Sequence, residues 1–414
     1  MCEETHAAAE AVARRSRSKL VAYLAAQWGD VASAEDALSD AFAVALARWP
    51  REGCPENPEA WLLTVARRKL IDAARRQRED ANTDALETLA GVECDELPDT
   101  IPDRRLALLF ACAHPAIDEA VRAPLMLQVV LGLEASQIAS AFLVSPAAMA
   151  QRLVRAKVKI RDAGIPFRVP ERNELPERLE AALGAIYACF TEGWTNAYGN
   201  DSCGADMARS ELAGEAIYLG RLLTELLPHE PEALGLLALM LYAEARRPAR
   251  RTAEGKFVPL RMQDARLWDA AMIAEAETAL RTASAARQIG RYQLEAAIQS
   301  AHIEGVRTGR VAWGAVVSLY DALVQVTESP VARINRAVAL AERDGAAAGI
   351  EALESASADV RLGSYQPYWA ARAYLLAQLG VREAAVRAYE VAIGLERDPA
   401  VREYLLERCE ELSK

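Results

Sequence analysis

The sequence has few aromatic residues, only four histidines, and none of the short motifs that mark the common enzyme families. Aromatic residues make up 6% of its 414 positions, and the histidines lie far apart, at 6, 114, 229 and 302. No GxSxG, Walker or GxGxxG sequence is present, and the many carboxylates follow helix surfaces. We therefore expect no catalytic residue and no cofactor, and we expect that the protein is not an enzyme.

Long apolar runs and cysteine pairs are also missing. No segment is apolar over a membrane-spanning length and no signal peptide precedes the chain, so we expect a cytoplasmic protein without membrane contact. The seven cysteines, at 2, 54, 94, 112, 189, 203 and 409, form no CxxC pair, which indicates reduced thiols. Cys112 and His114 lie close together, but without a second pair of ligands we expect no metal site.

An excess of basic charge is the third absence. The formal net charge is -11, and residues 1–170 hold 21 Lys and Arg against 24 Asp and Glu. A protein that held DNA by its overall charge would be basic, because counterion release drives that binding. Any contact with DNA must therefore come from local clusters, with a larger partner supplying most of the affinity.

The composition that is present favours helices. The chain is 52% hydrophobic and rich in Ala, Leu, Glu and Arg, and no stretch alternates at the two-residue period of a strand. Its length suggests two or three domains. We expect an all-α protein.

Residues 124–161 show the pattern of a helix-turn-helix. Ser145 and Pro146 supply a cap and a first-turn proline for a second helix. Along this helix an apolar face is followed on the other side by polar and basic residues: Met149, Leu153, Ala156 and Ile160 against Gln151, Arg152, Arg155 and Lys159, with Lys157 at the edge. Such a helix either enters the major groove of DNA or is a solvated surface helix, and this stretch alone leaves both interpretations open.

A second basic segment lies upstream. Residues 33–49 are predicted to form a helix with Glu35, Asp36 and Asp40 on its outer face, ended by Pro50 and a loop over residues 51–58. The next helix, residues 59–78, has Trp61 on its apolar side. Between residues 67 and 78 it carries six basic residues and one acid, Asp72; the basic residues are Arg67, Arg68, Lys69, Arg75, Arg76 and Arg78.

These segments together resemble regions two and four of a bacterial RNA polymerase sigma factor of the extracytoplasmic-function type. The resemblance rests on EDALSDAFAVALARWP, NPEAWLLTVARRKLIDAARRQ and a helix-turn-helix ending MAQRLVRAKVKIRDAG, in this order, and covers about residues 10–165. The remainder resembles the extension of a subgroup that carries a long carboxy-terminal helical-repeat domain.

The resemblance implies partners and roles. It implies that core RNA polymerase binds Asp36, Asp40, Phe42 and Trp49. Trp61 falls on the apolar stripe of its helix, so we expect it in the core rather than stacked on a base. The resemblance implies contact with the minus-ten element by Asn57, Arg67, Arg68, Lys69, Arg75 and Arg76, with Asn57 at a base edge and the basic residues on phosphates. It implies that the minus-35 element is read by Ser145, Gln151, Arg152, Arg155, Lys157 and Lys159. Leu143 and Ala150 depart from the family, which often has glycine and a basic residue there.

The resemblance and the composition together imply the domains. Region two spans residues 7–80, a linker follows at 81–103, and region four spans 104–165. The stretch 79–103 contains nine acids and no base, which is typical of a solvated linker. After a proline-containing linker, residues 176–414 are expected to form tetratricopeptide-like helical hairpins. Residues 336–354 and 372–390 are similar at an offset of 36, and Pro231, Pro330 and Pro399 lie near multiples of the repeat period.

Residues 244–269 interrupt the repeats with a cluster of Arg, Asp and Trp. They form either a functional insertion or a salt-bridged connector, and we favour the connector. The repeat surface is expected to bind a regulatory protein segment or the chain's own sigma domains, and to tune sigma activity. A different hypothesis also remains: a helix-turn-helix transcriptional regulator with a repeat sensor domain, which binds DNA but does not act as a sigma factor.

Overall fold

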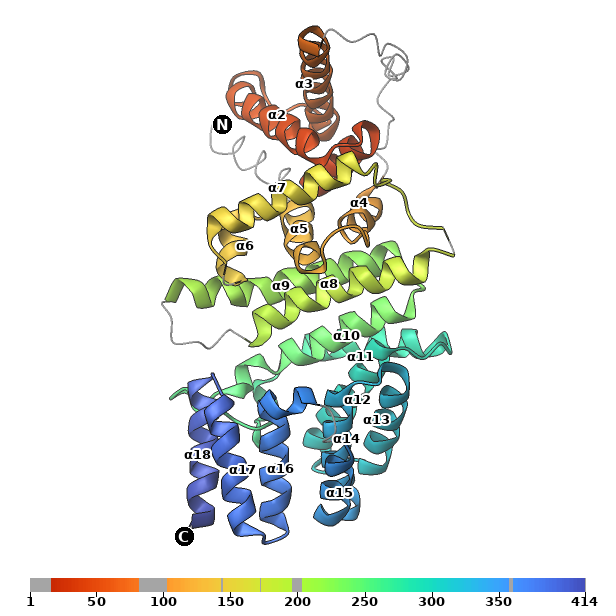
Figure 1. Cartoon of the computed structure of the whole chain (residues 1–414). Coiled ribbons are helices and arrows are strands. Elements are labelled where there is room, and N and C mark those ends of the chain that lie inside the picture. Colours follow the sequence, from red (N-terminus) through yellow and green to blue (C-terminus); the bar gives the residue numbers. More distant parts are fainter. Residues whose placement is uncertain are drawn as a thin grey trace. The chain divides into compact units, whose positions relative to one another are not determined.

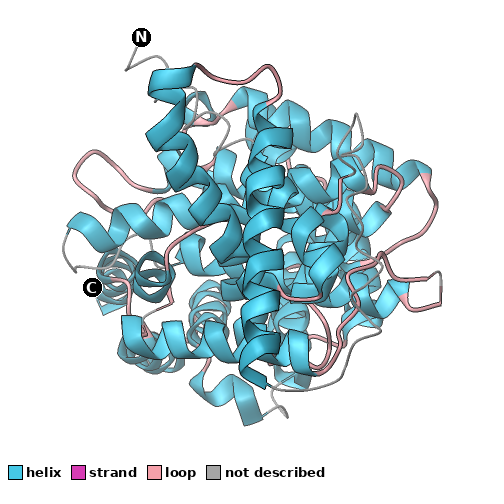
Figure 2. Cartoon of the chain, turned by 90° about the horizontal axis from the view of Figure 1, so that it is seen from above, coloured by secondary structure: helices cyan, strands magenta, loops and turns pink. Residues whose placement is uncertain are grey.

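The computed structural model describes residues 16–81, 103–142, 144–171, 173–195, 203–356 and 360–413, and in these ranges the fold is all-α, as predicted. No strand occurs among these residues (Figure 2). Arg251 and Phe257 form one isolated β-bridge. None of the described helices combines the length and the apolar character that crossing a membrane requires.

The contacts divide the chain into two compact units, Met1–Glu192 and Gly193–Lys414. The division falls inside helix α8 (Leu175–Thr195), whereas the composition had suggested a boundary within residues 164–176. Each unit has its own buried apolar core.

The first helices of the amino-terminal unit run through residues 16–28, α2 (Val31–Glu52) and α3 (Pro58–Ala81), as Figure 1 shows. Asp30 caps α2, since its Oδ1 accepts from the Ala32 N–H at 3.0 Å. The prediction that Pro50 ends the helix is wrong. The proline lies in the last turn, where it removes one i→i−4 hydrogen bond but the helix continues to Glu52, and Gly53 closes the end by donating to the Trp49 carbonyl at 2.9 Å.

Four more helices complete the predicted region four: α4 (Arg105–Cys112), α5 (Glu119–Leu131), α6 (Ala135–Ala141) and α7 (Pro146–Asp162). Asp118 caps α5 and Ser145 caps α7, and α6 packs against α7 as the two halves of a helix-turn-helix. The acidic linker, apart from Ala81 and Asp103, and the turn residue Leu143 lie outside the described residues.

The carboxy-terminal unit is a series of helices and three short 3-10 turns within the Arg-rich segment, with a fourth after α15. They are α9 (Cys203–Leu226), α10 (Pro231–Ala245), η1 (Arg247–Arg250), η2 (Leu260–Met262), η3 (Ala265–Leu267), α11 (Ala270–Ala285), α12 (Arg291–Thr308), α13 (Trp313–Thr327), α14 (Pro330–Asp344), α15 (Ala346–Ala356), η4 (Val360–Ser364), α16 (Gln366–Gln378), α17 (Arg382–Leu395) and α18 (Pro399–Ser413).

The segments that are similar at an offset of 36 are two helical hairpins. The first spans α14 and α15 and the second spans α16 and α17, and each turn holds a glycine with positive φ, Gly345 at 98° and Gly380 at 73°. Small residues let the helices approach closely. At Gly349 a Cβ atom would lie 2.4 Å from the Ala341 side chain. Pro231, Pro330 and Pro399 each begin a helix.

Candidate nucleic-acid interface

Helix α7 has one buried and one exposed face. Met149, Leu153, Ala156 and Ile160 are buried, which confirms the predicted packing face. Gln151, Arg152, Arg155 and Lys159 are exposed, while the Ser145 hydroxyl accepts from the Ala148 N–H at 3.3 Å as part of the cap.

Sequence reasoning missed two apolar side chains on this exposed face. Val154 is 59% exposed and Val158 is 37% exposed. With Gln151 and Arg155 they follow the i, i+3, i+4, i+7 spacing of one helix face, a signal that the sequence already contained. A face that alternates polar and apolar groups suits the major groove, where apolar side chains can contact thymine methyl groups.

The basic residues of α3 are mostly at the surface. Arg68, Lys69, Arg75 and Arg76 are exposed and Arg67 is half-buried. Lys69 forms an ion pair with Asp40 of α2 at 2.9 Å, with both side chains largely in solvent. Asn57 precedes the helix and is exposed; its Oδ1 accepts from the Ala60 N–H at 3.1 Å, so its amide nitrogen is the group left to donate to a base.

The outer face of α2 differs from the prediction at two residues. Asp36 and Asp40 are exposed and Phe42 is half-buried. Trp49, predicted as a polymerase contact, is only 2% exposed and packs edge-on against half-buried Trp61, with ring centroids 5.5 Å apart. Trp49 therefore belongs to the core rather than to an exposed surface, because it continues the buried stripe of Leu38, Ala41 and Ala45.

Glu35 is the second difference, since it was expected on the outer face and is buried, with 7% of its surface exposed. Its Oε2 lies 2.5 Å from the Lys157 Nζ of α7, and its Oε1 lies 3.4 Å from an Arg17 nitrogen. In this arrangement Lys157 is occupied by a carboxylate. The predicted contact of Lys157 with DNA requires that this pair open.

Cys112 is buried in the core, and His114 holds the turn that follows α4 through a hydrogen bond. Burial and, to a smaller extent, the nearby Glu35 carboxylate raise the pKa of Cys112 to about 12, which keeps the thiol protonated. The His114 Nδ1 accepts from the Ala116 N–H at 3.0 Å, and burial followed by Arg178 and Arg122 lowers the pKa of His114.

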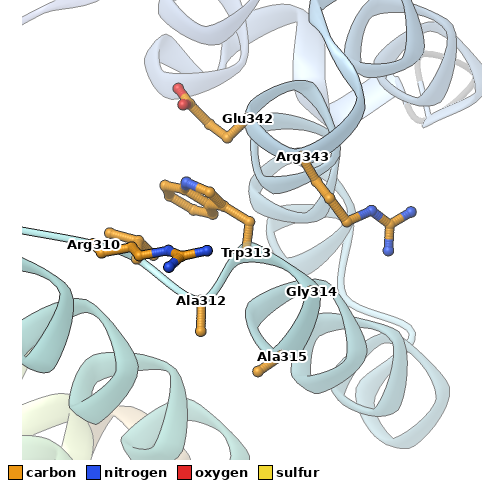
Figure 3. A pocket seen from close by; sticks show the side chains of 8 residues that line it. Arg310, Ala312, Trp313, Gly314, Ala315, Glu342 and Arg343 are labelled. Atoms are coloured by element: carbon orange, nitrogen blue, oxygen red, sulfur yellow. The ribbon is translucent and has the colours of Figure 1, made fainter.

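The carboxy-terminal unit has an open cavity of about 570 Å³ at the start of α13 (Figure 3). Trp313 forms its centre, Arg310 precedes it, and Glu342 and Arg343 reach it from α14. The Arg261 guanidinium stacks 4.7 Å from the Trp313 ring centroid and forms an ion pair with Glu342 at 2.8 Å.

The Arg-rich segment 244–269 behaves as a connector, the interpretation that the sequence favoured. Its cations pair with carboxylates on distant helices: Arg251 with Asp398, Lys256 with Glu407 at 3.0 Å, and Arg261 with Glu342. Phe257 adds an edge-on contact with Tyr404 of α18 at 5.6 Å. These contacts tie the segment to α14 and α18.

Comparison with known proteins matches two parts of the chain. Residues 12–79 match sigma-70 region 2, and residues 178–284 match a family of unknown function (DUF6596). An uncharacterized protein of Rhizobium meliloti (strain 1021) is 39% identical over 387 residues, which cover 92% of this chain and 90% of that protein. No solved structure matches the chain. The chain therefore belongs to one family with this relative, and its sigma-70 region 2 domain supports a sigma-70-family factor with a sigma-like role in transcription initiation.

Proposed function

We propose that the protein is a sigma factor of the extracytoplasmic-function type, which binds core RNA polymerase and directs it to specific promoters. One observation carries the proposal: the unit that contains the sigma-70 region 2 domain also contains a helix-turn-helix, α6 and α7, whose second helix is capped by Ser145. A regulator that only binds duplex DNA needs the second element but has no use for the first. The protein needs no cofactor or catalytic residue for this role.

Each surface has a proposed partner. The exposed carboxylates Asp36 and Asp40, with half-buried Phe42, suit an interface in which charge sets the orientation of the polymerase. The basic face of α3 would bind phosphates beside the minus-ten element, with Asn57 at a base edge. The exposed face of α7, with Gln151 and Arg155, would read the minus-35 element.

The carboxy-terminal unit is proposed to be a tetratricopeptide-like regulatory domain. The repeated hairpins α14–α15 and α16–α17 support this, as does the open cavity beside Trp313. Such a surface would bind a protein segment, from a regulatory partner or from the sigma domains, and so tune sigma activity.

The test of the sigma proposal is transcription that depends on core polymerase. Purified full-length protein is mixed with core enzyme and genomic promoter fragments, and transcript starts are mapped. We expect defined starts that disappear when Arg152 and Arg155 are both changed to alanine. A protein that retards promoter DNA by itself but never binds core polymerase would be a conventional regulator instead.

The regulatory proposal has a separate test in the same assay. A chain that ends at Thr195 keeps α8, whose Arg178 donates to the Phe110 carbonyl at 2.7 Å, and circular dichroism checks its fold. We expect transcript yield to differ from that of the full chain. Equal yields across a range of core polymerase concentrations would remove the idea that the carboxy-terminal unit tunes activity.

A further inference from the structure

The buried carboxylate of Glu35 joins parts of the chain that are far apart in sequence. Glu35 lies on α2, Arg17 lies on the preceding helix, and Lys157 lies on α7, 122 residues beyond Glu35. The side chains of Glu35 and Lys157 are only 10% and 12% exposed. Helices α2 and α7 pack against each other at this point (Figure 1).

Arg17 extends the same contact to α5. The Arg17 side chain lies close to Gly132, the C-cap residue of α5. A Cβ atom added at Gly132 would be 2.7 Å from the Arg17 Nη1. The guanidinium therefore pairs with Glu35 while it lies beside the carboxy-terminal end of α5, the helix that supports α7. A buried carboxylate between two cations is strongly destabilised when a partner is removed, because one charge is then left buried without compensation.

This contact conflicts with the geometry that promoter binding requires. Minus-ten and minus-35 elements are named for positions roughly 25 base pairs apart, which at about 3.4 Å per base pair is on the order of 80 Å of duplex. Region 2 and the helix-turn-helix cannot contact two such elements at the same time while one ion pair between α2 and α7 holds them together.

We propose that the Glu35–Lys157 ion pair is a latch that holds region 2 against the helix-turn-helix in the free chain and must open before both promoter elements are engaged. The inference rests on the proposed sigma function and specifies how that function is regulated. When the latch opens, Glu35 keeps Arg17 as its partner within region 2. Lys157 then joins Arg155 and Lys159 as a cation available to DNA phosphates, so the opened state is compensated on both sides.

The chain contains its own reporter of this opening. Cys112 is fully buried at the end of α4, and both Glu35 and Lys157 act on its thiol electrostatically, so it lies next to the latch. Cys54 is exposed and serves as the reference for reagent activity, and buried Cys189 of α8 reports loss of the fold. Site-resolved alkylation by iodoacetamide, read by peptide mass spectrometry, measures all three thiols in one sample.

Two substitutions separate opening from a local charge effect. Glu35→Gln removes a negative charge beside Cys112 and Lys157→Met removes a positive one, so a purely electrostatic influence would change the thiol reactivity in opposite directions. Opening accelerates alkylation of Cys112 in both variants. We expect roughly tenfold for Glu35→Gln, which leaves two cations facing each other, and less for Lys157→Met, where Arg17 still balances Glu35.

Controls and a rescue complete the design. Glu119→Gln makes the same chemical change at an exposed position of α5 and should leave the Cys112 rate unchanged. The conservative change Lys157→Arg keeps a cation opposite Glu35 and should return the rate to near that of the natural chain. Adding core polymerase and promoter DNA to the natural chain should accelerate Cys112 as the variants do.

Several results would overturn the latch. One is a Cys112 rate that rises in Glu35→Gln but falls in Lys157→Met, and another is a rate equal to that of Glu119→Gln in both. Acceleration of Cys189 together with Cys112 would also overturn it, since the pair would then hold the fold rather than a movable contact. The variant rates need neither polymerase nor DNA. A chain that fails to bind core polymerase would therefore defeat the sigma proposal while the latch itself was still measured.

Discussion

Two groups of basic residues in this protein have opposite surroundings. On α3 and α7, Arg68, Arg75, Arg152 and Lys159 are exposed, and none of them forms an ion pair within the described part of the chain. In segment 244–269, by contrast, Arg251, Lys256 and Arg261 form ion pairs with Asp398, Glu407 and Glu342, and Arg246 is buried. The comparison teaches that one basic cluster leaves cations in solvent, where they could meet an external partner, while the other uses them inside its own unit.

The largest expected effect concerns the internal group. Burial, followed by Arg246 and Arg261, lowers the pKa of His302 to about 4 from 6.5. The unfolded chain then binds a proton as the pH falls through 6.5, whereas the folded chain does not until near pH 4. Stability is therefore complete above pH 6.5 and declines toward pH 4, by about 3 kcal/mol at 1.36 kcal/mol per pKa unit.

Chemical unfolding of the natural chain and of His302→Gln between pH 7 and pH 4 measures this contribution. The transition that differs between the two proteins belongs to the carboxy-terminal unit, and the natural chain should have the steeper loss of stability. Parallel pH profiles would mean that the arginines of segment 244–269 do not act on the protein's own interior in this way.

The next effect concerns the external group. Arg152→Ala and Arg155→Ala should each weaken binding of minus-35 duplex to the holoenzyme by about 1–3 kcal/mol. Neither change should shift the unfolding free energy by more than about 0.5 kcal/mol, since both side chains are exposed. Fluorescence anisotropy and thermal unfolding check the two halves of this statement. A loss of stability as large as the loss of affinity would erase the difference between the groups.

How much of this contrast could be predicted from the sequence depends on what covers each helix face. Periodicity predicted the buried face of α7, from Met149 to Ile160, and the start of that helix at Ser145. It also contained the signal for Trp49, which follows Leu38, Ala41 and Ala45 at helical spacing, although the family resemblance implied a polymerase contact there instead.

Glu35 could not be placed in this way. A carboxylate at the edge of an apolar stripe is normally solvated, and its burial here is caused by a helix 122 residues further along the chain. The same holds for Arg251 and Asp398, which pair across 147 residues. Local pattern specifies the helices and their apolar faces, while pairs of distant charges depend on how the helices assemble.

A smaller effect is expected at Arg251. Burial alone would raise the pKa of Asp398, but the hydrogen bond and charge of Arg251, with the backbone donors of Ala400 and Val401, lower it overall. Arg251→Ala should therefore cost about 1–2 kcal/mol at pH 7, because both side chains are mostly buried. A depressed carboxyl pKa contributes stability above the unfolded value near 3.9 that is lost as the pH falls through the folded value. The stabilities of the two proteins should therefore converge as the pH falls below the unfolded value near 3.9, and a cost that stayed constant with pH would point to packing rather than charge.

The smallest effect is expected at the Asp40–Lys69 pair, where an exposed basic residue of α3 also forms an ion pair within the protein. This pair has an ion-pair distance of 2.9 Å, but its side chains are 58% and 44% exposed, so solvent screens it and rotamer entropy opposes it. Asp40→Asn should change the unfolding free energy by less than about 0.5 kcal/mol while weakening binding to core polymerase, measured with the full chain at two salt concentrations. The matched substitution Glu119→Gln, also exposed in the same unit, should affect neither quantity. Loss of stability in Asp40→Asn with unchanged polymerase affinity would place this pair with the structural pairs of segment 244–269, and the division between internal and external charges would then no longer follow exposure.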